Sequence, residues 1–152
     1  MRRLRRSESG QAGMEVIPFG VLTFVVGALM VANAWAVIDA KMAVSAAARE
    51  ATPAFVEAPV DGDPLALADA AARSAIAGAG RDPEGLALTP MEAVFARCET
   101  VRFETSYRIP AVQVPWVGGF GSGFTVTARH AEVVDPYRSG VPRTVNGCAT
   151  AV

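Results

Sequence analysis

One long stretch near the start of the chain carries no charge. It runs from Val16 to Ile38, 23 residues without an acidic or basic side chain. At about 1.5 Å per residue, a helix of this length measures roughly 35 Å, which is more than the ~30 Å hydrocarbon core of a bilayer. The pattern predicts one membrane-spanning helix that begins near Met14. Pro18 then falls in or near the first turn, where its missing N–H costs little.

After Ile38 the pattern becomes amphipathic instead of ending. The predicted apolar stripe consists of Ala40, Met42, Ala43, Ala46 and Ala47, and the charged residues off it are Asp39, Lys41, Arg49 and Glu50. Because alanine is the best helix former, we expect the membrane helix to continue as one rod. Pro53 disfavours helix at the residue before it, so the rod should end near Thr52.

A second, shorter helix is predicted after a linker. Asp63 is the expected N-cap and Pro64 the first helical residue. The helix should run to about Ala77, where Gly78 and Gly80 end it. Its predicted apolar face consists of Leu65, Ala68, Ala72 and Ile76.

The C-terminal part changes to a period of two. Apolar and polar residues alternate from Val101 to Ile109, which predicts a half-buried strand. Phe124 to Val134 is rich in β-branched residues and predicts another strand. Met91 to Cys98 is a further strand candidate, and residues 81–90 and 110–123 are expected to be loops. The predicted fold class is α+β: a long N-terminal transmembrane helix, a second short helix and a small antiparallel β-sheet head.

The charges are distributed unevenly about the apolar run. Residues 1–10 carry a net charge of +3 and the rest of the chain −4. Basic residues flanking a membrane helix stay in the cytoplasm, so we expect a single-pass membrane protein with a short cytoplasmic N-terminus and an exported C-terminal domain. Beyond residue 10 there is no basic run, which argues against nucleic-acid binding.

The residues just before the apolar run suggest proteolytic processing. Gly10 lies five residues before Glu15, which sits at the edge of the predicted span. A carboxylate in that position is costly and needs a partner. Cleavage after Gly10 would create an amine at Gln11, about one helical turn from Glu15. The two groups could pair within one chain or between neighbouring subunits of a filament.

This N-terminus resembles the type IV prepilins and, more narrowly, the TadE-like minor pilins and pseudopilins of the tight-adherence (Tad/Flp) pilus system. The matching residues are Arg2, Arg3, Arg5, Arg6, Ser9, Gly10, the segment Gln11 to Glu15, and Pro18 within the apolar run. The resemblance implies processing by a prepilin peptidase and a role in assembling or anchoring a pilus with other Tad pilus subunits in the lipid bilayer. It also implies three parts: a leader and processing region (1–13), a long helix (14–57) and an exported head (58–152).

Two other interpretations of the N-terminus stay open. The chain could be an uncleaved single-pass anchor that carries an extracellular binding domain. Alternatively, Ala32-Asn33-Ala34 could be the cleavage site of a secretory signal. The first residue of the mature protein distinguishes the three cases, because it would be Gln11, Met1 or Trp35 respectively.

The sequence contains no catalytic constellation, so no enzyme activity, cofactor or metal site is expected. His130 is the only histidine, and it has no evident nucleophile or metal-ligand partner. Ser122 lacks the Gly-x-Ser-x-Gly context of a nucleophile elbow. The glycines around it do not precede a helix, so they do not predict a phosphate loop.

Two further features have alternative interpretations. The apolar loop that contains Val112, Val114, Trp116, Val117 and Phe120 either completes the core over the sheet or contacts another pilus subunit or the membrane. Cys98 and Cys148 are most simply one disulfide of an exported domain, closing a loop of about 50 residues worth ~3–4 kcal/mol. The alternative is two unpaired, small buried residues.

Overall fold

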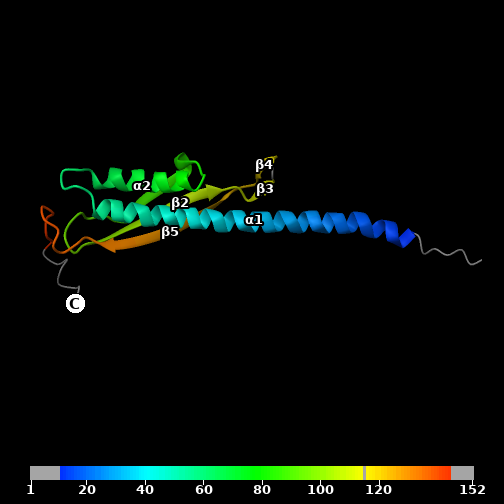
Figure 1. Cartoon of the computed structure of the whole chain (residues 1–152), viewed down its shortest axis with the longest axis horizontal. Coiled ribbons are helices and arrows are strands. Elements are labelled where there is room, and N and C mark those ends of the chain that lie inside the picture. Colours follow the sequence, from blue (N-terminus) through cyan, green and yellow to red (C-terminus); the bar gives the residue numbers. More distant parts are fainter. Residues whose placement is uncertain (1–10, 115, 145–152) are drawn as a thin grey trace, which may run out of the picture. The chain divides into compact units, whose positions relative to one another are not determined.

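The computed structural model of the chain describes residues 11–114 and 116–144, and for residues 11–15 the backbone alone. Its elements in chain order are α1 (Gln11–Val56), α2 (Pro64–Gly78), the short 3-10 helix η1 (Pro83–Gly85), β1 (Leu86–Glu92), β2 (Thr100–Ile109), β3 (Val112–Val114), β4 (Gly118–Phe120) and β5 (Phe124–Val133) (Figure 1). A long apolar helix, a second short helix and a small antiparallel sheet are present as expected. The chain divides after Ala36 into two compact units. The second, which starts at Val37, is called the head unit below.

Helix α1 is longer at both ends than the residue pattern predicted, although its end at Val56 agrees with the bound of 57 that the resemblance implied. It covers 46 residues, from Gln11 to Val56, so Pro18 lies in its interior instead of its first turn. Pro53 does not end the helix, although an interior proline typically costs about 3 kcal/mol. The reason lies just beyond it, where Phe55 (2% exposed) and Val56 (8% exposed) are buried in the core. Burying two such side chains contributes roughly 1.5–3 kcal/mol each, which offsets the cost of the proline.

The buried face of α1 in the head unit differs in part from the predicted stripe. Met42 and Ala46 are exposed, so the prediction was wrong for these two residues. At about 100° per residue they point away from the side that faces the core. The residues of α1 that are buried there are Ala40, Ala43, Val44, Ala47, Ala48, Ala51, Thr52, Phe55 and Val56.

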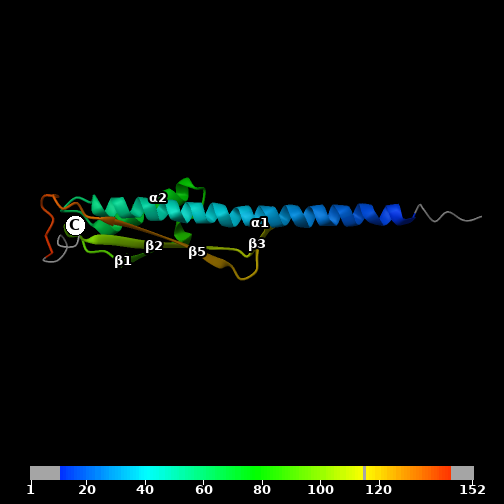
Figure 2. The same cartoon turned by 90° about the horizontal axis from the view of Figure 1, so that it is seen from below.

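The head unit packs two helices against one face of a three-stranded antiparallel sheet. The strand order is β1–β2–β5, and α2 lies beside the second half of α1 on that face (Figures 1 and 2). The predicted alternation of β2 is confirmed, because Val101, Phe103, Thr105 and Ile109 are buried against the helices. The ring of Phe55 meets that of Phe103 edge-on, with 5.4 Å between ring centroids.

One buried polar residue joins the sheet to α1. Thr105 is fully buried, and its Oγ1 donates a hydrogen bond of 2.8 Å to the carbonyl oxygen of Val44. A buried hydroxyl without a partner would be costly, so this bond makes the apolar surroundings of Thr105 tolerable. It also fixes the position of β2 along the helix.

The prediction for α2 is confirmed in its bounds and its cap. The Asp63 side chain accepts hydrogen bonds from the backbone N–H groups of Leu65 and Ala66, at 3.0 and 3.2 Å. On the predicted apolar face, Ala68, Ala72 and Ile76 are buried. Leu65, however, is 48% exposed, so it does not belong to that face.

Three strands lie where the sequence predicted loops or a shifted strand. β1 occupies Leu86–Glu92, mostly within an expected loop, and the candidate strand at residues 91–98 overlaps only its end. Pro90 hid this strand, although proline is tolerated on a sheet edge such as β1. The expected loop at 110–123 contains β3 and β4. Its glycines suggested turns, but Gly119 pairs with Gln113 and also lets Pro110 approach closely, because a Cβ at Gly119 would lie 2.6 Å from the Pro110 ring.

Candidate functional site

The residues of the proposed processing site lie at the start of the described chain. Gln11 and Glu15 are both in α1, four residues apart. Residues at this spacing lie on the same side of a helix, as the proposed pairing of amine and carboxylate requires. Gly10 falls outside the described residues, as do the side chains of Gln11 and Glu15. Cleavage after Gly10 and the pairing therefore stay predictions.

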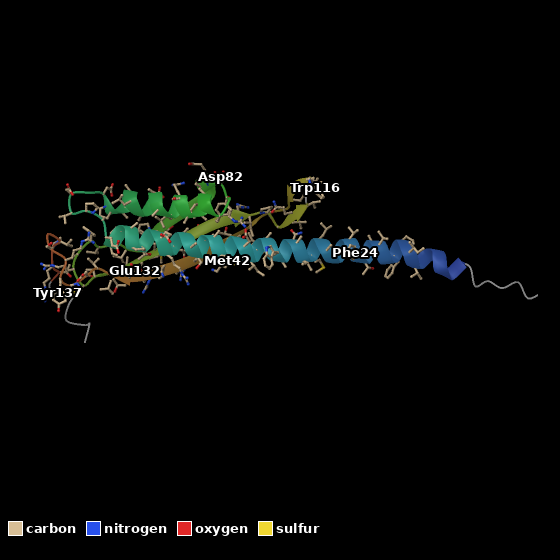
Figure 3. All side chains as sticks on the ribbon, in the orientation of Figure 1. Phe24, Met42, Asp82, Trp116, Glu132 and Tyr137 are labelled. Carbon is tan, nitrogen blue, oxygen red and sulfur yellow. The ribbon has the colours of Figure 1, made fainter. Side chains whose placement is uncertain are left out.

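The apolar part of α1 exposes its side chains instead of burying them. Phe24 is 75% exposed and Trp35 is 68% exposed, and Figure 3 shows Phe24 projecting outward from the helix. A water-soluble helix would bury such residues on at least one face. By length and composition, this helix can cross a membrane.

The polar side chains within the apolar segment bond to their own helix. Thr23 Oγ1 donates to the carbonyl oxygen of Phe19 at 2.9 Å, and Asn33 Nδ2 donates to that of Leu29 at 2.8 Å. Both donors reach back one turn. Internal hydrogen bonds of this kind lower the cost of placing a polar group in a hydrocarbon environment.

A shallow apolar hollow runs along the same segment. Three of its six lining residues are glycine or alanine, and two are aromatic. It is lined by Phe24, Gly27, Ala28, Val31, Ala32 and Trp35. Small residues allow another membrane helix to approach closely, so this surface suits contact with lipid or with a second helix.

The first charges after the apolar segment connect α1 to the rest of the head unit. Asp39 accepts a hydrogen bond from the Arg81 guanidinium at 2.7 Å, and this guanidinium also lies over the Tyr107 ring, 5.7 Å from its centroid. Lys41 Nζ donates to the carbonyl oxygen of Thr127 on β5. Sequence reasoning missed these contacts. The only available signal was that Asp39 and Lys41 are the first charges after an uncharged run.

The apolar loop forms a projecting hairpin. β3 pairs with β4, and the side chains of Val112, Trp116, Val117 and Phe120 are exposed. They therefore do not complete the core over the sheet, which was one of the two interpretations. Figure 3 shows Trp116 at the end of the hairpin.

Among residues 11–114 and 116–144, no group of side chains is arranged to bind a metal ion. His130 Nε2 lies 3.4 Å from Glu132 Oε1, and both side chains are about one-third exposed at the edge of the sheet. Ser122 lies in the turn between β4 and β5, away from this pair in the sequence. His130 pairs with Phe103 on β2, whereas β5 begins after Ser122 at Phe124, which pairs with Ile109, so His130 and Ser122 lie at opposite ends of β5.

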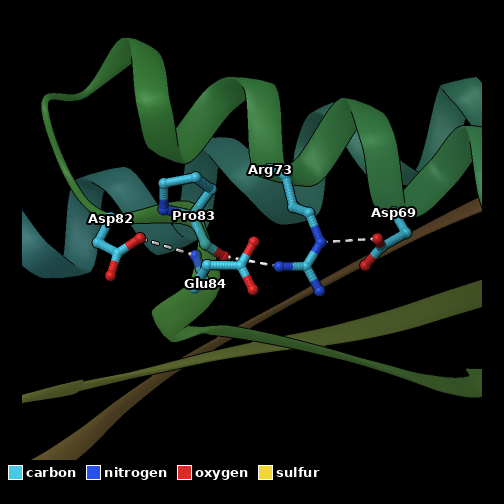
Figure 4. Close-up of polar contacts among 5 residues, drawn as sticks. All are labelled: Asp69, Arg73, Asp82, Pro83 and Glu84. Carbon is cyan, nitrogen blue, oxygen red and sulfur yellow. Dashed lines mark hydrogen bonds and ion pairs between the residues drawn. The ribbon is translucent and has the colours of Figure 1, made fainter.

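One polar cluster between α2 and the turn that follows it has a structural role. Arg73 Nε pairs with Asp69 Oδ2 at 2.7 Å, and its NH1 donates to the carbonyl oxygen of Pro83 at 2.8 Å (Figure 4). Nearby, Asp82 accepts a hydrogen bond from the N–H of Glu84 and so caps η1. The hydrogen bond with Asp69, and then the charge of that carboxylate, raise the pKa of Arg73 above its ordinary value. The cluster joins α2 to the turn that leads into β1.

Of the two cysteines, Cys98 lies within the described residues. Cys98 is largely buried, with a left-handed φ of 65°, at the turn before β2. Cys148 lies outside the described residues, so the proposed disulfide stays a prediction. The described part of the tail does approach Cys98, because Arg97 N donates to the carbonyl oxygen of Pro142 at 2.9 Å.

A small pocket on the sheet is lined by Met91, Arg102, Arg129, His130 and Ala131. Both arginines of this pocket are paired with acids of neighbouring strands, Arg129 with Glu104 and Arg102 with Glu92. The features that set this chain apart are the exposed apolar segment of α1 and the projecting hairpin. Comparison of the chain with protein-family models, curated proteins and solved structures found no match.

Proposed function

We propose that the chain is a minor pilin or pseudopilin of a Tad-type pilus, anchored in the membrane by α1 and cleaved between Gly10 and Gln11 by a prepilin peptidase. It acts in pilus assembly or anchoring through contacts with other pilus subunits. The observation that carries the proposal is the continuity of α1. One helix includes Gln11 and Glu15, passes through the exposed apolar segment and ends in the core of the head unit.

The membrane anchor rests on the exposed apolar side chains of residues 16–38. In water they would leave a large apolar surface unprotected, which promotes aggregation, whereas lipid solvates it. The internal bonds of Thr23 and Asn33 suit the same environment. The four arginines at positions 2, 3, 5 and 6 favour a cytoplasmic N-terminus, which places the head unit on the exported side.

The pilin assignment, as opposed to a simple anchor, rests on Gly10 and Glu15. A carboxylate at the edge of the span has a natural partner if cleavage releases an amine one helical turn before it. The amine of one subunit can also meet the carboxylate of the next, which gives a reason for assembly. The hollow lined by small residues on α1 offers a surface against which a neighbouring helix can pack.

The test is the N-terminus of the mature protein, determined by mass spectrometry after expression with a prepilin peptidase and extraction from membranes. We expect it at Gln11. A Gly10→Val variant should remain uncleaved, because a β-carbon obstructs close approach to the backbone, while the neighbouring Ser9→Ala control is processed normally. Membrane-inserted protein that still begins at Met1 would favour the uncleaved binding domain. A start at Trp35 would show a secretory signal and overturn the proposal.

A further inference from the structure

The β3–β4 hairpin belongs to the second-longest uncharged stretch of the chain. Between Arg108 and Arg129, 20 consecutive residues carry no acidic or basic group. Most of this stretch, residues 110–123, connects β2 to β5, and such connections run over the protein surface. Here it exposes the apolar side chains of Val112, Trp116, Val117 and Phe120. An exposed apolar patch with a polar rim usually marks a contact surface.

The backbone of the hairpin is largely paired within itself. Val112 is paired with Phe120 and Val114 with Gly118, and Val117 N donates to the carbonyl oxygen of Val114 at 3.2 Å. Paired backbone groups are much less costly to remove from water than free ones. The hairpin can therefore enter a less polar environment without opening.

Trp116 at the tip is held in an unusual conformation. Its φ is 64°, in the left-handed region that bulky residues rarely adopt, and its side chain is fully exposed. Because the ring is fully exposed, packing within the head unit does not offset this strain. Strained and exposed residues often lie where a binding partner contacts the protein.

Three contacts within the head unit show where the hairpin points. Along α1, Phe55 meets Phe103, Val44 accepts the hydrogen bond from Thr105, and Lys41 bonds to Thr127, which pairs with Ser106. α1 and β2 therefore run in opposite directions, so the end of β2 lies toward the start of the head unit at Val37. β3 and β4 continue beyond the ends of β2 and β5 (Figure 2). The hairpin therefore points toward the end of the head unit where the chain enters the apolar segment.

We propose that the tip of this hairpin, formed by Trp116, Val117 and Phe120, inserts into the interface of the same lipid bilayer that α1 spans. Tryptophan is enriched at membrane interfaces, because its ring is apolar and its N–H can bond to headgroups. Arg108, exposed where β2 ends, is suited to contact lipid phosphates with its long side chain. The inference rests on the proposed membrane anchor, and it gives the head unit a second contact with the bilayer.

The experiment uses the full-length protein reconstituted into lipid vesicles, with tryptophan fluorescence as the readout. Trp35 and Trp116 are the only tryptophans, so each can be observed alone. The Trp35→Phe variant reports on the hairpin, and the Trp116→Phe variant reports on α1. As a matched control, Tyr137→Trp in a background lacking both tryptophans places the probe at another highly exposed position of the head unit.

We expect lipids brominated near the headgroup end of the acyl chain to quench Trp116. Acrylamide quenching of Trp116 should be roughly threefold weaker than that of the Tyr137→Trp control. If brominated lipid quenches Trp35 but not Trp116, while acrylamide quenches Trp116 fully, α1 is inserted and the hairpin inference is overturned. If Trp116 is shielded from both quenchers, protein covers the hairpin and the inference is equally overturned. If brominated lipid does not quench Trp35, the proposed anchor itself fails.

Discussion

Glu15 is the residue on which the proposed pilus role can be tested most directly. Replacing it with alanine leaves the amine of Gln11 without its charge partner near the hydrocarbon boundary. Losing one member of a desolvated charge pair costs roughly 3–5 kcal/mol. We predict that the Glu15→Ala variant is made, inserted and processed but assembles poorly with its pilus partners. Co-purification with those partners and a count of surface pili measure the effect.

The matched control for this variant is Glu50→Ala, which removes an exposed acid from the head-unit part of α1. Its assembly should equal that of the wild type. If Glu15→Ala also assembles normally, Glu15 is a solvated charge at the membrane edge and has no role in pairing.

Thr105 allows a second test, of the contact that joins β2 to α1. Thr105→Val keeps the shape of the side chain but removes the hydrogen bond to the Val44 carbonyl. We predict a loss of about 1 kcal/mol in the free energy of unfolding, the typical net value of one such bond. Thr125→Val, at an exposed position of β5, should change it by less than about 0.5 kcal/mol. Equal effects in thermal or denaturant unfolding would contradict a specific role for the Thr105 bond.

Elements with a local sequence signal, such as one solvent-exposed face or an N-cap, could be predicted. Element ends that depend on contacts with residues distant in the sequence could not. β2 was found because the chain alternates from Val101 to Ile109, and α2 because Asp63 and Pro64 start it locally. The local residue pattern missed the end of α1, because the burial of Phe55, a tertiary effect, outweighs the local effect of Pro53.

The candidate site was predictable only where it depends on the local sequence. The apolar segment and the Gly10–Glu15 spacing can be seen directly in the chain. The pairing of Asp39 with Arg81 joins residues 42 positions apart, and no spacing rule indicates it. The sequence also did not determine whether the hairpin is exposed, because apolar loop residues can either cover a core or face outward.

We predict that a disulfide anchors the C-terminal tail to the head unit. The tail passes beside Arg97 and reaches Thr144, which lies four residues before Cys148. Thr144 Oγ1 donates a hydrogen bond to the carboxylate of Glu99. If Cys98 and Cys148 form the disulfide, thiol labelling of the native exported protein should find no reactive cysteine. Reduction should then lower the free energy of unfolding by ~3–4 kcal/mol. Stoichiometric labelling of both cysteines would refute the pairing.

At the scale of the whole molecule, α1 belongs to two units with different surroundings. The core of the head unit includes Val44, Ala47 and Phe55 from α1. We predict that an exported chain starting at Val37 is soluble and unfolds cooperatively. A chain starting at Ala58 lacks the central helix of that core and should aggregate or remain unfolded. Circular dichroism and thermal unfolding of the two truncated chains measure the difference. A folded chain from Ala58 would show that α1 is dispensable to the head.

The bond between Thr105 and Val44, 61 residues apart, also has a consequence for the order of events during biosynthesis. In the proposed topology, residues 40–56 emerge on the exported side long before β2 and β5 have been made. Roughly 80 further residues must follow before Val134 is available, which at the usual rate of translation takes on the order of ten seconds. For that time the apolar face of the helix has no sheet to cover it. We therefore expect the newly exported chain to be held by a chaperone or by the membrane surface until its last strand arrives.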